Sequence, residues 1–276
     1  MTDQLGYRFK IGVIIPSTNT SCQPEMDALR VPGVTNHVAR MFIHDDSMEE
    51  KPGFDHVMHS IRSSTEPAIR AVVTCAPDHL VIAVSPESYW EGPESHGRIL
   101  KSMRSIGGGL PVTMSPDAIK AALDCYGDVR RIAVITPYLP LGDDPVSRFF
   151  TDSGYEVVNI TGLGCTSPAQ IAHVSEARLR QAVREVDGPD VQAIVQVGTN
   201  VAMARVATAA EAWLDKPVLS NNVALYWHAL RQGGVHDSIT GFGSLLERHL
   251  HLPERTNGTT PTNPHLTYST TGIAGR

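Results

Sequence analysis

Short apolar segments alternate with longer amphipathic segments along this 276-residue chain. Short apolar runs suit buried strands, and amphipathic stretches suit helices that cover the faces of a sheet. The predicted strands are Ile11–Ile15, His37–Phe42, His79–Val84, Pro111–Met114, Arg131–Thr136, Glu156–Ile160, Gln192–Val197 and Pro217–Leu219. The predicted helices lie at about 54–75, 94–106, 116–126, 143–153, 174–186, 201–214 and 222–233. This alternation predicts an α/β fold with mostly parallel sheets.

The order of the motifs repeats in outline. Ile11–Asn19 (IGVIIPSTN) opens the first half of the chain, and Ile132–Tyr138 (IAVITPY) opens the second. Later in each half another apolar strand runs into small polar residues, at Val81–Glu87 and at Ile194–Asn200. We therefore expect two pseudo-symmetric Rossmann-like lobes, each with a mostly parallel four-stranded sheet flanked by helices. Because ligands of open parallel sheets bind beyond the carboxyl ends of the strands, the active site is expected in the cleft between the lobes.

The length suits two lobes of about 100–150 residues each. The predicted organisation is an N-terminal lobe at 1–115, a C-terminal lobe at 116–235, a closing segment at 236–252 and a tail at 253–276. The tail is rich in Thr, Asn, Gly and Pro, a composition that favours an extended or disordered segment.

Composition excludes several classes of function. A formal net charge of −6 argues against a nucleic-acid or anionic-membrane partner, because such partners require clustered Lys and Arg. No apolar run approaches the roughly 20 residues that span a bilayer, and the first ten residues lack the apolar core of a secretory signal. The four cysteines show no CxxC spacing and the twelve histidines form no HExxH motif, so we expect reduced thiols, a cytoplasmic location and no metal site.

Polar residues follow the first strand of each half. Ser17, Thr18 and Asn19 stand where a strand turns into a helix, and a helix N-terminus favours a bound carboxylate. The alternative is plain helix capping, for which the same residue types are preferred. Tyr138 stands at the matching place in the second half, where its phenol donates to an oxyanion or serves only for packing.

Polar residues also follow the second strand end of each half. Ser85, Pro86 and Glu87 come after the strand that ends near Val84, and Glu87 is the only carboxylate directly after any of these four strands. If the neighbouring aromatic residues desolvate Glu87, its pKa rises and it suits general acid or base catalysis. The alternative is a solvated loop glutamate.

In the second half, Gly198, Thr199 and Asn200 offer backbone N–H groups and small side chains that suit anion binding. No GxSxG motif supports a Ser-His-Asp triad, and His228 is interpreted as a packed helix residue.

Three stretches together resemble the aspartate/glutamate racemase superfamily, and within it the branch of maleate cis–trans isomerases and arylmalonate decarboxylases. They are GVIIPSTNT followed by PEMDAL, RIAVITPYLPLGD, and KPVLSNNVALYWHALRQGGV, and the resemblance runs from about residue 8 to residue 247. It implies two Rossmann-like lobes around a cofactor-free active site. It also implies a homodimer or higher homo-oligomer.

The resemblance fails at the residues that usually carry the chemistry. These enzymes typically place a catalytic cysteine after a first-half strand, after a second-half strand, or after both. Here the two positions fall at about Val84-Ser85 and at Gly198, and neither is cysteine. Asn19 and Tyr138 do match the family's carboxylate-binding asparagine and tyrosine. A further asparagine of maleate isomerases is replaced around Ser167-Pro168.

Cys22, one short turn after Asn19, is kept as a possible cleft residue, whereas Cys75, Cys125 and Cys165 fall at helix ends or loops and are expected to be inert.

Our leading hypothesis is a cofactor-independent enzyme that acts on a small carboxylate or carbonyl compound through an enolate-like or oxyanion intermediate. A decarboxylase or other lyase without a catalytic cysteine is the preferred form, with Glu87, Tyr138 and Ser85 as the catalytic residues. Three further hypotheses stay open. They are a hydrolase of an amide, lactone or imine that uses water activated by Glu87, a non-catalytic carboxylate-binding protein, and a cis–trans isomerase with a cysteine-free route.

Overall fold

Two four-stranded sheets organise the molecule. The structure is a computed structural model that describes residues 3–84, 89–90 and 92–253. The sheets have the strand orders β2-β1-β3-β4 and β6-β5-β7-β8, and every neighbouring pair is parallel. Subtracting four from each strand number of the second order gives the first, so the two sheets share one topology. The predicted α/β fold with two pseudo-symmetric lobes is confirmed.

The strands are β1 (Phe9–Pro16), β2 (Val34–Met41), β3 (His79–Ile82), β4 (Val112–Met114), β5 (Arg131–Thr136), β6 (Glu156–Gly162), β7 (Ala193–Gln196) and β8 (Val218–Leu219). The helices that the sequence predicts are present as α2 (Lys51–Val73), α4 (Gly92–Ile106), α5 (Ser115–Asp124), α6 (Pro140–Asp152), α7 (Glu176–Val186), α8 (Ala204–Leu214) and α9 (Asn221–Gln232).

The helix expected after Asn19 is present as α1 (Cys22–Ala28), and two short elements were not predicted: the 3₁₀ helix η1 (Gln170–His173) and α10 (Ser244–Arg248). They are too short to show a clear helical period. Except for its first residue, the predicted tail at 253–276 lies outside the described residues.

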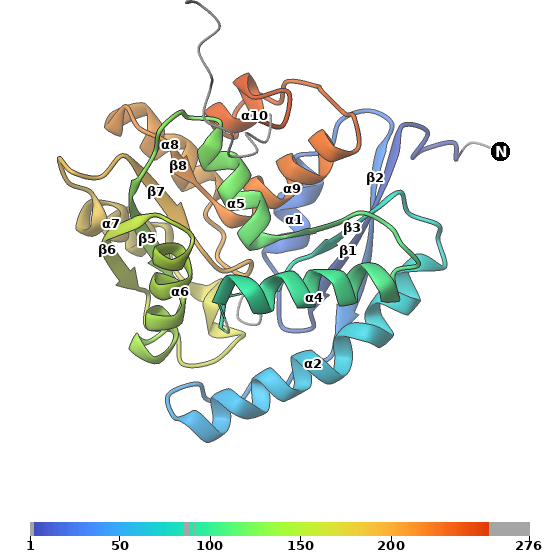
Figure 1. Ribbon diagram of the computed structural model, residues 1–276, viewed down its shortest axis with the longest axis horizontal. Coiled ribbons are helices and arrows are strands. Elements are labelled where there is room, and N and C mark those ends of the chain that lie inside the picture. The colour runs from blue at the N-terminus through green and yellow to red at the C-terminus, as the bar shows by residue number, and fades with distance from the viewer. Residues whose placement is uncertain (1–2, 85–88, 91, 254–276) are drawn as a thin grey trace, which may run out of the picture.

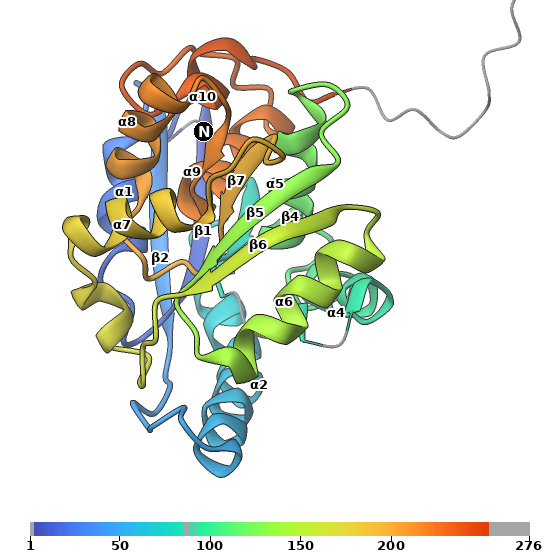
Figure 2. The ribbon, with the colours of Figure 1, turned by 90° about the vertical axis from the view of Figure 1, so that its left-hand side faces the viewer.

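Both faces of each sheet are covered by helices. Along β1, Ile11, Val13 and Ile15 enter one apolar cluster with α5 and α9, whereas Ile14 enters a second cluster with α2. This alternation follows from side chains that point to opposite faces at successive strand positions. In the second sheet α7 and α8 pack on one side and α6 lies along β6, as Figure 2 shows.

Helix α9 links the two halves of the molecule. It follows β8 in the chain but packs against β3, β4 and α5 (Figure 1). From Asn221 to Arg231 every residue is buried, and Trp227 donates a hydrogen bond from Nε1 to the carbonyl of His249, 2.7 Å away. Helix α9 therefore packs between elements of both halves of the chain.

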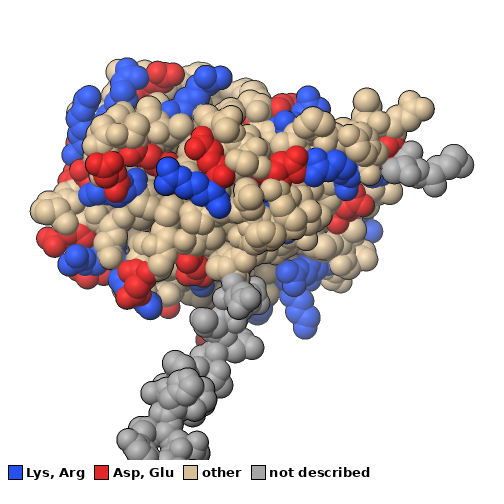
Figure 3. All heavy atoms as spheres, turned by 90° about the horizontal axis from the view of Figure 1, so that it is seen from above, with Lys and Arg blue, Asp and Glu red and all other residues tan. Residues whose placement is uncertain are grey.

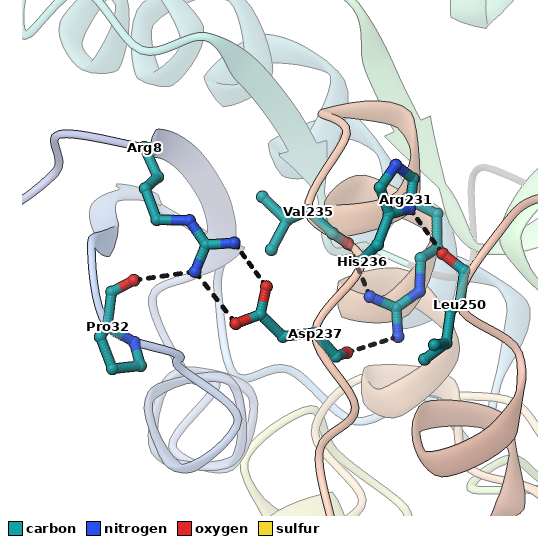
Figure 4. Close-up of polar contacts among 7 residues, drawn as sticks. All are labelled: Arg8, Pro32, Arg231, Val235, His236, Asp237 and Leu250. Carbon is teal, nitrogen blue, oxygen red and sulfur yellow. Dashed lines mark hydrogen bonds and ion pairs between the residues drawn. The ribbon is translucent and has the colours of Figure 1, made fainter.

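The segment after α9 is fastened by two arginines (Figure 4). The buried Arg231 guanidinium donates to the carbonyls of Val235 at 2.6 Å and Asp237 at 3.0 Å. The Asp237 carboxylate pairs with Arg8 at 3.0 and 2.5 Å, and Arg8 also donates to the carbonyl of Pro32. These contacts tie residues 235–237 to the beginning of β1.

On the face drawn in Figure 3, Lys and Arg side chains are interspersed with Asp and Glu side chains, so this face carries no field of a single sign. Among the helices in the described ranges, none combines the length and apolar character needed to cross a bilayer. Within the same ranges no group of three or more His, Cys, Asp and Glu side chains is placed to hold a metal ion.

Two glycine substitutions should have opposite effects on stability. Gly233, directly after α9, lies against Phe9 of β1. A Cβ atom at Gly233 would lie 2.2–2.7 Å from ring atoms of Phe9, and the φ of −80° at Gly233 suits alanine, so only the clash opposes it. We expect Gly233→Ala to destabilise the protein by about 1–3 kcal/mol, the usual cost of overpacking.

Gly97 in α4 is the matched control, because it is exposed and its Cβ would meet nothing within 4 Å. Gly97→Ala should stabilise the protein by about 0.5–1 kcal/mol through its higher helix propensity. Urea unfolding midpoints measure both changes, and equal shifts for the two variants would contradict this description of α9.

Candidate active site

The carboxyl ends of four strands line one pocket. Thr18 and Asn19 follow β1, Val84 follows β3, Pro137 and Tyr138 follow β5, and Gly198, Thr199 and Asn200 follow β7. The pocket encloses about 460 Å³ of empty space, part of it open to solvent. In each sheet these are the two central strands, between which the order of connections reverses, and ligands of parallel sheets bind at such points.

The pocket has a polar wall and an apolar wall. Its polar groups are those of the strand ends just named. Its apolar groups come from residues 43–48, from α2 and from residues 168–171, and they are Ile43, Met48, Val57, Ile61, Pro168 and Ile171. No charged side chain is among the described residues that line the pocket. A ligand therefore meets both uncharged polar groups and hydrocarbon.

Asn19 is buried at the centre of the polar wall, and its amide has one defined orientation. Oδ1 accepts from the backbone N–H groups of Ser21 at 3.1 Å and Cys22 at 2.9 Å, at the beginning of α1. Nδ2 donates to the hydroxyl of Thr199 at 3.0 Å. An amide nitrogen carries two protons, so Nδ2 retains one N–H group for a ligand.

The Thr199 hydroxyl joins three strand ends. It donates to the carbonyl of Ala83 after β3, at 2.9 Å, and accepts from Asn19 after β1. Because the Ala83 carbonyl only accepts, the direction of both hydrogen bonds is fixed.

The side chain of Asn200 holds neighbouring loops in place. Its Oδ1 accepts from the backbone N–H groups of Thr20 at 2.9 Å and Ser21 at 3.3 Å. Its Nδ2 donates to the carbonyls of Pro168 at 3.0 Å and Thr18 at 3.4 Å. The polar atoms of the Asn200 side chain are therefore occupied, and its backbone N–H has no partner among the described residues.

The turn at residues 198–200 offers backbone donors. Gly198 has a φ of +108°, and a Cβ atom there would lie 2.8 Å from the ring of Pro137, so glycine is required on both grounds. None of the hydrogen bonds within the described part of the chain uses the N–H of Gly198, Thr199 or Asn200 as its donor. Unpaired N–H groups in a buried pocket wall are suited to an anion.

Tyr138 presents its phenol from β5. Its backbone N–H donates to the hydroxyl of Thr136 at 3.1 Å, and that hydroxyl donates to Asp143. Burial raises the pKa of Tyr138 above its ordinary value, so the phenol stays neutral and remains a donor. No hydrogen bond to the Tyr138 hydroxyl occurs among the described residues, and the ring of Trp90 packs edge-on against the tyrosine ring at 5.9 Å between centroids. Burial also raises the pKa of Asp143, to about 6.

Two residues of the sequence-based site, Ser17 and Cys22, do not line the pocket. Ser17 does not line the pocket, because its hydroxyl is bonded to the backbone of Ile43, accepting from N–H at 3.0 Å. Cys22 is fully buried inside α1 with Sγ 3.8 Å from the sulfur of Met26, and burial raises the pKa of its thiol. Ser85, Pro86 and Glu87 lie outside the described residues. His228 is buried in α9 and bonds Thr113 at 2.8 Å, as expected of a packed helix residue.

The sequence pattern of the arylmalonate decarboxylase family matches residues 11–246. The chain belongs to the arylmalonate decarboxylase family. The match covers both sheets and every described strand end of the pocket. The resemblance inferred from the three sequence stretches is thereby confirmed, and with it the assignment to a family of enzymes.

Known members show how far the likeness extends. The maleate isomerase of Nocardia farcinica is 25% identical over 254 residues, which cover 88% of this chain and 97% of that protein. A solved structure of a cysteine-to-serine mutant of the N. farcinica maleate cis–trans isomerase, with a covalently bound succinylcysteine intermediate, superposes with a TM-score of 0.78 at 24% identity. That superposition covers 87% of this chain and 98% of the other. A structure of arylmalonate decarboxylase gives a TM-score of 0.69 at 21% identity, covering 86% and 98%.

The apolar wall was missed by sequence reasoning. Val57 and Ile61 fall within the helix predicted at about 54–75, and nothing in the sequence marked them, or Ile43, Met48 and Ile171, as pocket residues. The hydrogen bond from the Met48 N–H to the carbonyl of Thr166, 2.7 Å long, brings these segments together from opposite halves of the chain. Such pairing has no local signature.

The position of Cys22 predicts an unreactive thiol. At neutral pH, iodoacetamide should modify Cys22 at least about tenfold more slowly than the partly exposed Cys75, because the buried thiol forms little thiolate. Unfolding in urea should equalise the two rates. Mass spectrometry of peptides measures both, and rapid modification of Cys22 in the native protein would return it to the list of catalytic candidates.

Proposed function

We propose that this chain is a cofactor-independent enzyme that binds a small carboxylate and stabilises an enolate-like intermediate. The form that fits best is decarboxylation of a malonate-type substrate that carries an apolar substituent. The observation that supports it is the division of the pocket into a wall of neutral donors and a wall of hydrocarbon. Membership of a family named for arylmalonate decarboxylase agrees with it.

The polar wall accounts for stabilisation of the intermediate. One carboxylate of the substrate accepts hydrogen bonds from the free N–H of Asn19, from the Tyr138 phenol and from backbone N–H groups of residues 198–200. When the second carboxylate leaves as CO₂, the electron pair of the broken C–C bond moves into the retained carboxylate and gives an enediolate. Donors that are already held in place stabilise this growing charge without reorganisation.

The apolar wall accounts for the departure of CO₂. A carboxylate held against side chains such as Ile43, Met48 and Ile171 loses its water shell. Conversion to neutral CO₂ removes the charge from this environment, so desolvation favours the products over the bound dicarboxylate. The same wall accommodates an aryl or alkyl substituent.

The enediolate carbon must then gain a proton. We propose Glu87 as its donor, as inferred from the sequence, with Ser85 as a further polar group; both follow Val84, which lines the pocket. In this step the Glu87 carboxyl proton forms the new C–H bond, and solvent returns a proton to the carboxylate. The net change is loss of CO₂ and gain of one solvent proton at carbon.

Cis–trans isomerisation is the second candidate, because the curated relatives are named maleate isomerase. One of these relatives was captured with a succinylcysteine intermediate. No cysteine is among the described residues that line the present pocket, and residues 85–88 contain none. An isomerase of this kind would need a cysteine-free route, which ranks it below decarboxylation. Hydrolysis of an amide, lactone or imine ranks lower still, as does carboxylate binding without turnover.

The test is turnover of phenylmalonate, alkylmalonates and maleate by the purified, chelator-treated protein. We expect CO₂ release from at least one malonate and, in D₂O, one deuterium at the α-carbon of the product. Tyr138→Phe should lower kcat by about 10²–10³, the usual effect of losing one oxyanion donor, and Glu87→Gln should lower it as well. Tyr7→Phe is the matched control, because Tyr7 is exposed and outside the pocket.

Each competing reaction gives a different result. Fumarate formed from maleate would favour isomerisation, and oxygen-18 from labelled water in a product carboxylate would favour hydrolysis. No turnover of any malonate, or a Tyr138→Phe variant with unchanged kcat, would contradict the proposed mechanism.

A further inference from the structure

A buried carboxylate lies behind the polar wall. Glu25 belongs to α1, and its Oε1 accepts from the backbone N–H of Ala204, the first residue of α8, at 2.9 Å. Its Oε2 accepts from Nδ2 of Asn222, in the first turn of α9, at 2.8 Å. No Lys or Arg within the described ranges forms an ion pair with it. Burial raises the pKa of Glu25, and its two hydrogen bonds oppose this effect.

The carboxylate decides which way the Asn222 amide faces. An ionised carboxylate only accepts hydrogen bonds, so Asn222 must turn its nitrogen, rather than its oxygen, toward Glu25. The same nitrogen donates its other proton to the carbonyl of Thr199, 2.9 Å away. A flipped amide would place its oxygen against both the carboxylate and the carbonyl, which is repulsive on both sides. Glu25 therefore selects the one orientation in which Thr199 is bonded.

The Thr199 carbonyl and the Asn200 N–H belong to one peptide group. In a trans peptide the C=O and N–H bonds lie in one plane and point in opposite directions. The hydrogen bond from Asn222 holds the carbonyl toward α9, and so it directs the Asn200 N–H away from α9. That N–H is one of the donors of the pocket wall that no described residue occupies.

We propose that Glu25 is a positioning residue of the active site, which acts through Asn222 to fix the Thr199–Asn200 peptide and to aim the Asn200 N–H at the carboxylate of the ligand. This inference rests on the proposed function, because it names a residue that prepares the same anion-binding wall. Glu25 does not touch the ligand. Its effect reaches the pocket through two hydrogen bonds and one rigid peptide plane.

A pair of variants separates this role from simple structural support. In Glu25→Gln the new amide has one oxygen that accepts and one nitrogen that only donates. Its two ends therefore cannot accept from both Ala204 and Asn222. In the double variant Glu25→Gln/Asn222→Asp the introduced amide accepts from Ala204 and donates to the introduced carboxylate, which restores the link between α1, α8 and α9. That carboxylate has no N–H group for the Thr199 carbonyl and turns an oxygen toward it, so the peptide stays unfixed and one repulsive contact is added.

The readouts are the urea unfolding midpoint and the dissociation constant for phenylacetate, a monocarboxylate probe whose binding does not require turnover. We expect Glu25→Gln to lower the midpoint and to weaken phenylacetate binding by about tenfold or more, the loss expected for a charge-assisted hydrogen bond. The double variant should regain part of the midpoint, through the restored link between α1, α8 and α9, while its binding stays at least as weak as in the single variant.

Glu211→Gln is the matched control. Its carboxylate also accepts from backbone N–H groups, those of Val218 at 3.2 Å and Ser244 at 2.7 Å, but Glu211 does not line the pocket. This variant should lower the midpoint and leave phenylacetate binding unchanged.

Wild-type affinity in the double variant would overturn the positioning role, and so would wild-type affinity in Glu25→Gln. Failure of the wild-type protein to bind phenylacetate would overturn it too, since there would be no carboxylate to aim at. Binding without turnover of any malonate contradicts only the proposed reaction.

Discussion

The hydroxyl of Thr199 is the contact on which the pocket depends. It accepts from Asn19 and donates to the carbonyl of Ala83, so one oxygen atom joins the ends of β1, β3 and β7 across the two halves of the chain. Parallel sheets bring their strand ends to one edge, but they do not by themselves fix the distance between two such edges. Helix α9 contacts elements of both halves, and this hydroxyl adds a direct link between the strand ends.

The polar wall is rich in donors. Two of its acceptors are already occupied: the oxygen of Asn19 by the beginning of α1, and the carbonyl of Thr199 by Asn222. One N–H of Asn19 and the backbone N–H groups of residues 198–200 are left, beside the hydroxyls of Thr18 and Tyr138. Such a wall suits an acceptor-rich, negatively charged ligand, although no cationic side chain is among the described residues that line the pocket.

The sequence predicted the framework because the framework is repetitive. Alternating strands and helices identify parallel sheets, and the place where polar residues follow a strand predicted Asn19, Tyr138 and Thr199 as neighbours. The features of the site that the sequence did not predict depend on tertiary contacts between residues that are distant in the chain. Glu25 and Asn222, for example, are 197 positions apart. Ser17 and Thr18 are equivalent in the sequence pattern, but the hydroxyl of Ser17 accepts from the backbone N–H of Ile43. Cys22 illustrates the same limit: it is the first residue of α1, and its side chain is buried in the core and does not line the pocket.

Gly198 stands where the sequence resemblance predicts a catalytic cysteine in related enzymes. Here the positive φ and the Pro137 ring oppose any side chain, and we propose that the turn acts through its backbone N–H groups. The most direct test of this role is a crystal structure of the protein soaked with phenylacetate. We predict carboxylate oxygens within about 2.7–3.2 Å of Asn19 Nδ2 and of the Asn200 backbone nitrogen, with the phenyl ring against Ile43 and Met48. A carboxylate that points to solvent, or one that is bound at another surface, would contradict it.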